Sequence, residues 1–200
     1  MPPSPVWLIR HGESTANAGL ITTNAASSPL TARGREQALK AAAQVPRRPD
    51  VIVVSPMQRA IETAMPIIAR WPDVPQETWA IQEFTYLSHA KVHGLNVAGR
   101  RPMAAAYWQR ENPEYVDGDD AESFAVFAGR LKAFHERLLT LEGFVVVVGH
   151  GQFFHAYKTA LQQGLTITPQ WMRAFRRADL LTPLQNGEII VVEPAGIVLG

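Results

Sequence analysis

The sequence contains no cysteine among its 200 residues. This absence excludes disulfide bonds, thiolate nucleophiles and metal sites built on cysteine. It also fits a reducing compartment, so we expect the protein to be cytoplasmic.

The sequence also lacks an excess of charge and any long apolar run. Its 19 Lys and Arg residues nearly balance its 18 Asp and Glu residues, and the basic residues are scattered. The valine run at 145–148 is far shorter than the roughly 20 apolar residues of a membrane-spanning helix. The opening MPPSPVWLIRHG has no charged region of the kind that begins a signal peptide. We therefore expect neither a nucleic-acid partner nor a membrane partner.

Three short apolar runs stand out in a chain whose length and 46% hydrophobic content suit a single domain. They lie at Val6–Ile9, Val51–Val54 and Phe144–Val148, and none of them alternates with polar residues. Such runs are typical of strands buried on both faces, as in a parallel sheet.

Helical patterns lie between these runs. The first, within 30–45, has Thr31 as its expected N-cap. In the second, Ser55 is the expected N-cap and Pro56 takes the first helical position, while Pro66 is expected to end or kink the helix.

Two further helices are expected in the second half of the chain. The stretch 120–141 is amphipathic, and Asp120 is its expected N-cap. The stretch 152–164 is expected to end at Gly164.

Near the end, Asn186-Gly187 separates two strand-like runs and predicts a β-hairpin. The stretch 71–118 is rich in Pro, Trp, Tyr, His and Arg and has little periodicity. We interpret it as an inserted cap over one end of the sheet. The alternation of strands and helices predicts a three-layer α/β/α sandwich with a mostly parallel central sheet.

Each of the three strand-like runs ends in polar residues of similar character. These are Arg10-His11-Gly12, then Ser55-Pro56 followed by Arg59, and Gly149-His150-Gly151. Ligands of open α/β sheets gather at the carboxyl ends of the strands. If the strands are parallel, two arginines and two histidines converge there.

This set of residues suits a phosphate ester. Guanidinium groups hold phosphate through paired hydrogen bonds, and a neutral imidazole is a competent nucleophile. A second imidazole, if protonated, would offset charge in the transition state. Glycines beside the histidines let the backbone approach the ligand.

The same residues resemble the motifs of the histidine phosphatase superfamily, also called phosphoglycerate mutase-like. The matching blocks are LIRHGESTAN, PLTARGREQA and SPMQRAIETA, followed by AESFAVFAGR and VVVVGHG. The resemblance implies that His11 is the nucleophile that becomes phosphohistidine. It also implies that Arg10, Arg59 and His150 surround the phosphoryl group and that Asn17 hydrogen-bonds near it.

The family resemblance also implies a general acid in the middle of the chain. Glu83 is our candidate, with Tyr86 three residues later as in the mutase-type E-x-x-Y arrangement. Glu83 would protonate the leaving alkoxide and then deprotonate the attacking water. The alternative for Glu83 is an exposed loop glutamate. No metal and no cofactor are expected, because the arginines and His150 supply the positive charge.

Several weaker signals keep two interpretations. Arg100 and Arg101 would contact a second anionic group of the substrate, or form a solvated surface pair. Gln152 would touch substrate or pack at a helix N-terminus. His89 and His93 have the spacing of a metal clip, but no third ligand is apparent, so exposed loop histidines are favoured.

We therefore expect a metal-independent phosphomonoester hydrolase that acts on a small phosphorylated metabolite. The alternatives are a cofactor-dependent phosphoglycerate mutase and a phosphate-binding module without catalysis. Known mutases of the superfamily are usually longer, whereas this sequence ends soon after its expected hairpin, which favours hydrolysis. The sequence indicates neither the natural substrate nor the oligomeric state.

Overall fold

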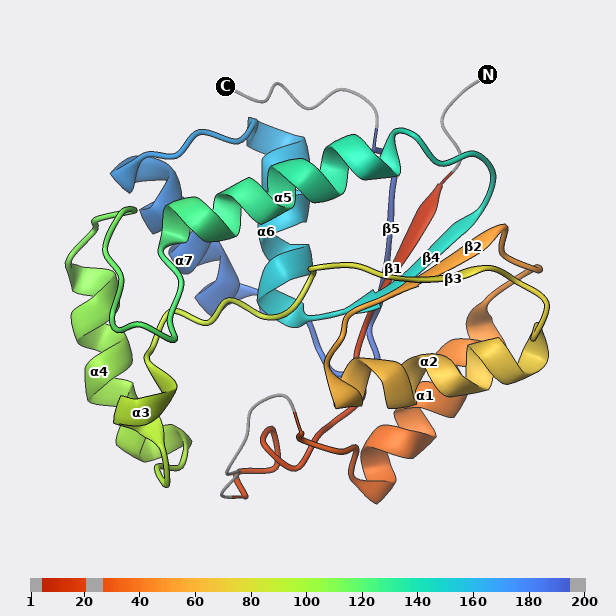
Figure 1. Ribbon diagram of the computed structural model, residues 1–200, viewed down its shortest axis with the longest axis horizontal. Helices are drawn as coiled ribbons and strands as arrows, with labels where there is room; N and C mark the ends of the chain where they lie inside the picture. Colours follow the sequence, from red (N-terminus) through yellow and green to blue (C-terminus); the bar gives the residue numbers. More distant parts are fainter. Residues whose placement is uncertain (1–4, 21–26, 195–200) are drawn as a thin grey trace.

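The computed structural model describes residues 5–20 and 27–194, in which a five-stranded sheet carries helices on both faces (Figure 1). The strands are ordered β3-β2-β4-β1-β5 across the sheet. Four of them run parallel, and β5 runs antiparallel to β1. This arrangement confirms the predicted fold class. The strands are β1 (Val6–Arg10), β2 (Val51–Val54), β3 (Gln76–Thr78), β4 (Val145–Gly149) and β5 (Ile189–Val192).

The two faces of the central strands pack against different helices. Leu8 and Val147 belong to an apolar cluster with α5, α6 and α7, whereas Ile9 and Val146 belong to a cluster with α1 and α2. All four side chains are fully buried, as expected for strands covered on both sides. The covering helices are α1 (Ala32–Gln44), α2 (Gln58–Arg70), α5 (Phe124–Leu138), α6 (Gly151–Gln163) and α7 (Pro169–Leu181).

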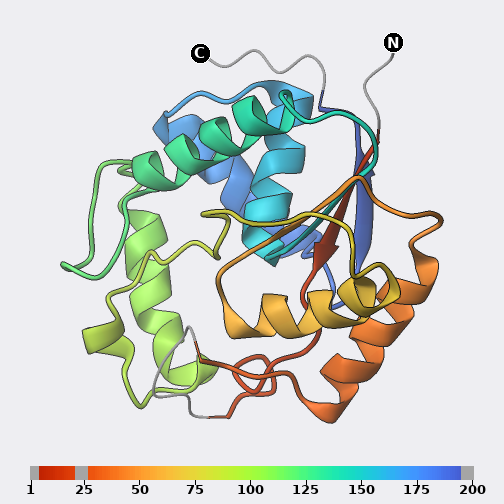
Figure 2. The ribbon, with the colours of Figure 1, turned by 45° about the vertical axis from the view of Figure 1, so that its right-hand side comes forward.

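The expected insertion at 71–118 does not lie wholly outside the sheet, and we call residues 89–109 alone the cap. Residues 76–78 form β3, which pairs with β2 at the edge of the sheet. The helices α3 (His89–Val92) and α4 (Val97–Gln109) lie apart from the two covering layers (Figures 1 and 2). The short α3 also replaces the loop that was expected around His89.

Helix α2 differs from its expected form at both ends. Its N-cap is Met57 instead of Ser55, so Pro56 precedes the helix. The Ser55 hydroxyl is used elsewhere, because it hydrogen-bonds His150 Nε2 at 2.8 Å. Pro66 does not end the helix, which continues to Arg70. Burial of its apolar face outweighs the hydrogen bond that a proline removes.

Of the other three predicted helix ends, two are confirmed and one is wrong. Thr31 caps α1 by accepting a hydrogen bond from Gly34 N, and Gly164 ends α6. Ser123, and not Asp120, caps α5, because the Asp120 carboxylate accepts a hydrogen bond from Ala90 N in the cap instead.

The predicted hairpin at the end of the chain does not form. Its first run is the last turn of α7, and its second run is β5, which pairs with β1. Asn186-Gly187 still makes a turn, with a φ of 78° at Gly187, but the turn leads from a loop into β5. Among the residues that the structure describes, no helix is long and apolar enough to cross a bilayer.

Candidate active site

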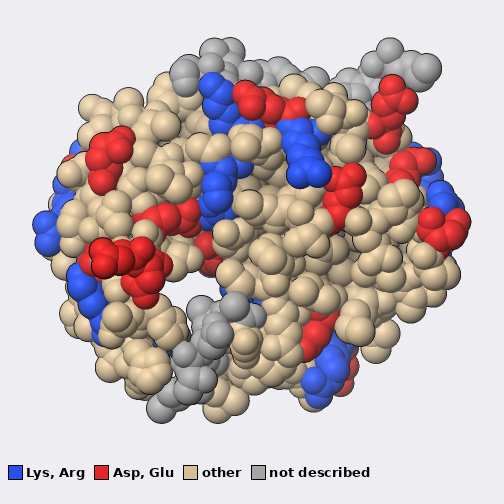
Figure 3. All heavy atoms as spheres, in the orientation of Figure 1, with Lys and Arg blue, Asp and Glu red and all other residues tan. Residues whose placement is uncertain are grey.

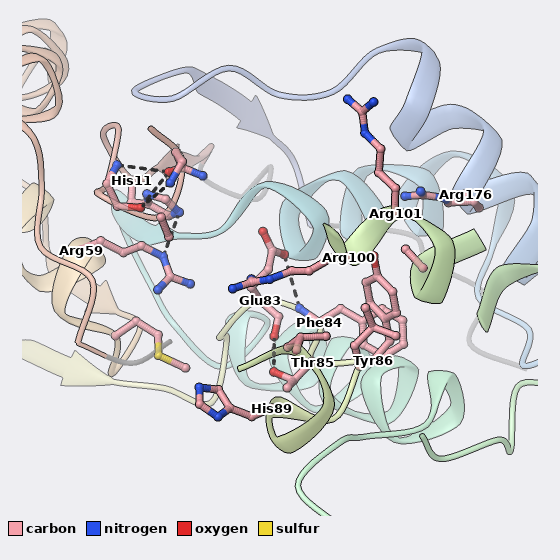
Figure 4. Close-up of a pocket in the computed structure, with 17 residues that line it drawn as sticks. His11, Arg59, Glu83, Phe84, Thr85, Tyr86, His89, Arg100, Arg101 and Arg176 are labelled. Atoms are coloured by element: carbon pink, nitrogen blue, oxygen red, sulfur yellow. Dashed lines mark hydrogen bonds between the residues drawn. The ribbon is translucent and has the colours of Figure 1, made fainter. Parts of the chain in front are cut away.

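A cavity of about 440 Å³ lies where β1 and β2 end, between the body of the protein and the cap. Figure 3 shows the molecule hollowed in this region, and Figure 4 shows the side chains that face the cavity. The phosphate-site candidates lie toward one side and the cap residues toward the other. The lining includes His11, Asn17, Arg59, Glu83, Tyr86, His89, Arg100, Arg101 and Arg176.

His11 presents one ring nitrogen for chemistry. Its Nδ1 lies 2.7 Å from the carbonyl oxygen of Gly12, which assigns the proton to Nδ1. Nε2 therefore carries a lone pair, and it accepts a hydrogen bond from Arg59 Nε at 3.1 Å. Burial, helped by the charge of Arg59, lowers the pKa of His11 to about 3. The imidazole is therefore neutral at neutral pH, as a nucleophile must be.

His150 lies beside His11, with ring centroids 5.0 Å apart. Its Nδ1 lies 3.2 Å from an Arg59 nitrogen, and its Nε2 donates to the Ser55 hydroxyl. Burial and then Arg59 lower the pKa of His150 well below its ordinary value. Without a bound anion the His150 imidazole is therefore neutral, because a second positive charge beside Arg59 is unfavourable.

Arg10 is the second guanidinium near His11. It donates through NH1 to the carbonyl oxygen of Leu184, while its buried Nε has no hydrogen-bond partner among the described atoms. Arg10 does not line the cavity wall itself. An unpartnered buried donor beside His11 is a position where an anion would be stabilised.

Gly12, the residue after His11, lies too close to the backbone of Gly34 for a side chain to fit. A Cβ on Gly12 would lie 2.3 Å from the carbonyl oxygen of Gly34, at the start of α1. This contact lets the Gly12 amide donate to Thr63 Oγ1 in α2 at 3.0 Å. The loop after β1 is therefore clamped between α1 and α2.

Asn17 lines the cavity from the same loop. Its Oδ1 accepts hydrogen bonds from Ser14 Oγ at 3.0 Å and from Asn186 Nδ2 at 3.2 Å. Asn186 also donates to the carbonyl oxygen of His11. The expected turn residue Asn186 therefore supports the loop that carries His11 and Asn17, a role that its sequence context did not indicate.

Glu83 lines the cavity from an irregular segment after β3 and lies between His11 and Tyr86 in Figure 4. Its Oε1 accepts a hydrogen bond from Gln152 N at 3.0 Å. Burial raises the pKa of Glu83 above its ordinary value, although the charges of Arg10 and Arg59 oppose that rise. A carboxyl group with a raised pKa and access to the cavity can carry the proton that a general acid needs.

Helix α5 holds the segment that carries Glu83. Arg130 donates to the carbonyl oxygens of Ala80 and Gln82, both at 3.0 Å. It also pairs with Glu122, whose backbone amide in turn bonds the carbonyl oxygen of Thr85. Bonds on both sides of Glu83 thus fix an irregular segment that has no strand or helix of its own.

The cap side of the cavity is aromatic and cationic. Tyr86, Arg100 and Arg101 line it, as does His89. His89 is half-buried, so it is not the exposed histidine that was expected, and His93 is exposed. No cluster of three or more metal-ligating side chains occurs in the part of the chain that the structure describes.

Two residues of α7 complete the surroundings of the cavity, and no motif in the sequence pointed to either. Arg176 lines the cavity and lies over the ring of Trp108, 4.9 Å from its centroid. Asp179 accepts a hydrogen bond from Gln152 Nε2 at 2.9 Å. Gln152 itself does not line the cavity, which favours the packing role over substrate contact.

The family model of the histidine phosphatase superfamily (branch 1) matches residues 6–188. The chain belongs to this superfamily. The match confirms the resemblance stated from the motifs, and it spans β1 to β4, both histidines and the helices on each face.

The curated relatives match a smaller part of the chain than the family model does. The adenosylcobalamin/alpha-ribazole phosphatase of Salmonella typhi is 27% identical over 135 residues. That match covers 66% of this chain and 66% of the relative, so it spans slightly less than two thirds of each.

Solved structures of similar fold cover more of the chain. The mycobacterial glucosyl-3-phosphoglycerate phosphatase is 25% identical, with a TM-score of 0.70 over 94% of this chain and 89% of that one. A putative alpha-ribazole-5'-P phosphatase from Escherichia coli is 22% identical, with a TM-score of 0.70 over 95% and 91%. The latter likeness concerns the fold alone.

Proposed function

We propose that this protein is a metal-independent phosphomonoester hydrolase that acts on a small phosphorylated metabolite through a phosphohistidine at His11. The observation that carries this proposal is the neutral His11 ring, which lines the cavity and accepts a hydrogen bond at Nε2 from Arg59 Nε at 3.1 Å. Glu83, which lines the same cavity, supplies a carboxyl group with a raised pKa. We also propose that the enzyme acts in the cytoplasm, as its cysteine-free composition predicts.

The first chemical step transfers the phosphoryl group to the enzyme. The lone pair of His11 Nε2 attacks phosphorus while the bond to the ester oxygen breaks. Glu83 gives its proton to the departing alkoxide, and Arg10 and Arg59 offset charge on the phosphoryl oxygens. A phosphate dianion also raises the pKa of His150, so that its Nδ1 can hold a proton toward the phosphoryl group.

The second step returns the enzyme to its starting state. Water gives a proton to the Glu83 carboxylate as its oxygen attacks phosphorus, and the bond to His11 Nε2 breaks. Inorganic phosphate leaves, and Glu83 is again protonated. Acid and base are thus one residue used in turn.

The proposed function is tested with p-nitrophenyl phosphate in the presence of EDTA. We expect turnover that survives the chelator and is abolished in His11→Ala, together with an acid-labile phosphohistidine in the wild type. His93→Ala is the matched control, because His93 is exposed and outside the cavity. Chelator-sensitive activity, or activity in His11→Ala, would refute the mechanism.

A second assay separates hydrolase from mutase. With 3-phosphoglycerate and 2,3-bisphosphoglycerate, a hydrolase releases free phosphate, whereas a mutase yields 2-phosphoglycerate. A binding module without catalysis would give neither product and no phosphohistidine.

We further propose that Tyr86, Arg100 and Arg101 contact the part of the substrate beyond the phosphoryl group. All three line the cap side of the cavity. A panel of phosphate esters with and without a second anionic group tests this, with α-ribazole phosphate and glucosyl-3-phosphoglycerate included because named relatives suggest them. Arg100→Leu is expected to raise KM selectively for doubly anionic esters, and the exposed Arg177→Leu is the control.

A further inference from the structure

Helix α7 is connected to the general-acid candidate through one glutamine. Asp179 accepts a hydrogen bond from Gln152 Nε2 at 2.9 Å, and the backbone amide of Gln152 donates to Glu83 Oε1 at 3.0 Å. We propose that Asp179 is a positioning residue that holds Gln152, and through it orients the carboxyl group of Glu83. The inference rests on the hydrolase proposed above.

The position of Gln152 at the start of α6 explains why its backbone amide needs a second contact to keep its direction. It lies in the first turn of α6, where backbone amides have no partner within the helix and are available to a carboxylate. The direction of that amide depends on how the turn is held. The bond from its side chain to Asp179 ties this turn to α7, so that one residue is fixed at both its side chain and its amide.

Asp179 is better placed for Gln152 than for its nearest cation. Its side chain is only 12% exposed, and its contact with Arg176, one turn away on the same helix, is longer at 3.4 Å. Burial of a carboxylate is costly unless it is hydrogen-bonded. The shorter bond to Gln152 therefore indicates that the carboxylate is oriented toward the α6 terminus.

The negative charge of Asp179 also affects Glu83, because it raises the pKa of the Glu83 carboxyl group. Burial raises the pKa of Glu83 most, and Asp179 raises it further, while Arg10 from β1 and Arg59 from α2 lower it. The other titratable or charged groups that line the cavity are His11, Tyr86, His89, Arg100, Arg101 and Arg176, and His150 lies beside His11. Asp179 thus favours the protonated form of Glu83 that the first step uses.

Two variants test the hydrogen bond between Gln152 and Asp179 separately from the charge of Asp179. Asp179→Asn removes the charge but keeps an oxygen that can accept from Gln152. Gln152→Leu keeps the charge but removes the side-chain bond. A good leaving group needs little help from an acid, whereas an alkoxide needs a proton, so each variant is assayed with p-nitrophenyl phosphate and with glycerol phosphate. The measured quantity is kcat/KM, which reports the step that forms the phosphohistidine.

In Gln152→Leu we expect kcat/KM to fall about tenfold for glycerol phosphate and less than about twofold for p-nitrophenyl phosphate. In Asp179→Asn the alkaline limb of the glycerol phosphate profile should move to lower pH. Equal losses on both esters would show a merely structural role and overturn the inference, as would unchanged kinetics in both variants.

A titration that does not depend on turnover keeps the test independent of the proposed activity. The carboxyl carbon of Glu83, followed by ¹³C NMR, should titrate at lower pH in Asp179→Asn than in the wild type. An unchanged titration would contradict the inference even in an active enzyme. Failure of the hydrolase itself would appear differently, as a wild type that cleaves neither ester.

Discussion

Two buried histidines are expected to make the protein lose stability as the medium becomes mildly acidic. His11 and His150 are 2% and 0% exposed, and the native pKa of each lies below the ordinary value of 6.5. Between the unfolded and the native pKa, the unfolded chain binds protons that the native protein excludes. The free energy of unfolding must therefore fall as the pH falls below about 6.5.

The magnitude follows from proton linkage. From about pH 7.5 to about pH 5.5, a histidine with an unfolded pKa of 6.5 that stays neutral when folded costs about 1.4 kcal/mol of stability. His11, with a native pKa of about 3, stays neutral throughout this range. His11 alone should therefore cost about 1.4 kcal/mol, and His150, whose pKa is also lowered, adds a loss in the same direction. Glu83 contributes with the opposite sign, because its pKa is raised in the native state.

Urea unfolding at the two pH values, in a buffer without phosphate, measures this loss. In His11→Asn the difference between the two pH values should be smaller by about 1.4 kcal/mol, whereas the exposed His93→Asn should leave it unchanged. Comparing each variant with the wild type cancels the contributions of Glu83 and of the other histidines. If the stability of His11→Asn depends on pH as that of the wild type does, the conclusion that His11 is neutral in the folded protein is refuted.

The remaining predictions concern the supports of the site. Ser55→Ala removes the hydroxyl bonded to His150 Nε2, so kcat/KM should fall about fivefold, and the buried ring nitrogen left without this partner should cost about 1 to 3 kcal/mol in urea unfolding. Gly12→Ala places a Cβ 2.3 Å from the Gly34 carbonyl oxygen and should cost about 3 kcal/mol in urea unfolding. Its control, Gly129→Ala at an open helical position, should stabilise the protein by about 0.5 to 1 kcal/mol. Arg130→Met should cost about 3 kcal/mol and slow alkyl esters more than aryl esters, whereas Arg137→Met in an exposed pair should cost at most about 1 kcal/mol.

The central strands were predictable because their signal is local. Val51–Val54 and the valines of β4 are apolar without alternation, and burial on both faces of the sheet requires that pattern. The parallel order then places the ends of β1, β2 and β4 at one edge, which is why the positions of His11, Arg59 and His150 followed from the sequence.

The helix starts were predictable only where no other group competed for the capping side chain. Thr31 caps α1 as its sequence context predicts. Ser55 has the same chemistry, but the His150 ring lies 2.8 Å away, and the hydroxyl makes that bond instead. The partner is 95 residues distant in the sequence, so no local pattern reveals it.

Helix α7 shows why the surroundings of the acid could not be read from the sequence. Its last residues, Leu180 and Leu181, resemble a strand beside an Asn-Gly turn, yet they are exposed and belong to a helix that Thr168 caps. This helix contributes Arg176 and Asp179 to the site. Both are residue types that are common on protein surfaces, and they reach the site only because α7 packs against α6. Packing brings Asp179 to Gln152 and Gln152 to Glu83, and these contacts span 27 and 69 residues of sequence. The position of His11, the proposed nucleophile, is thus set by motifs next to strands, whereas the environment of Glu83, the proposed acid, is set by the way two helices meet.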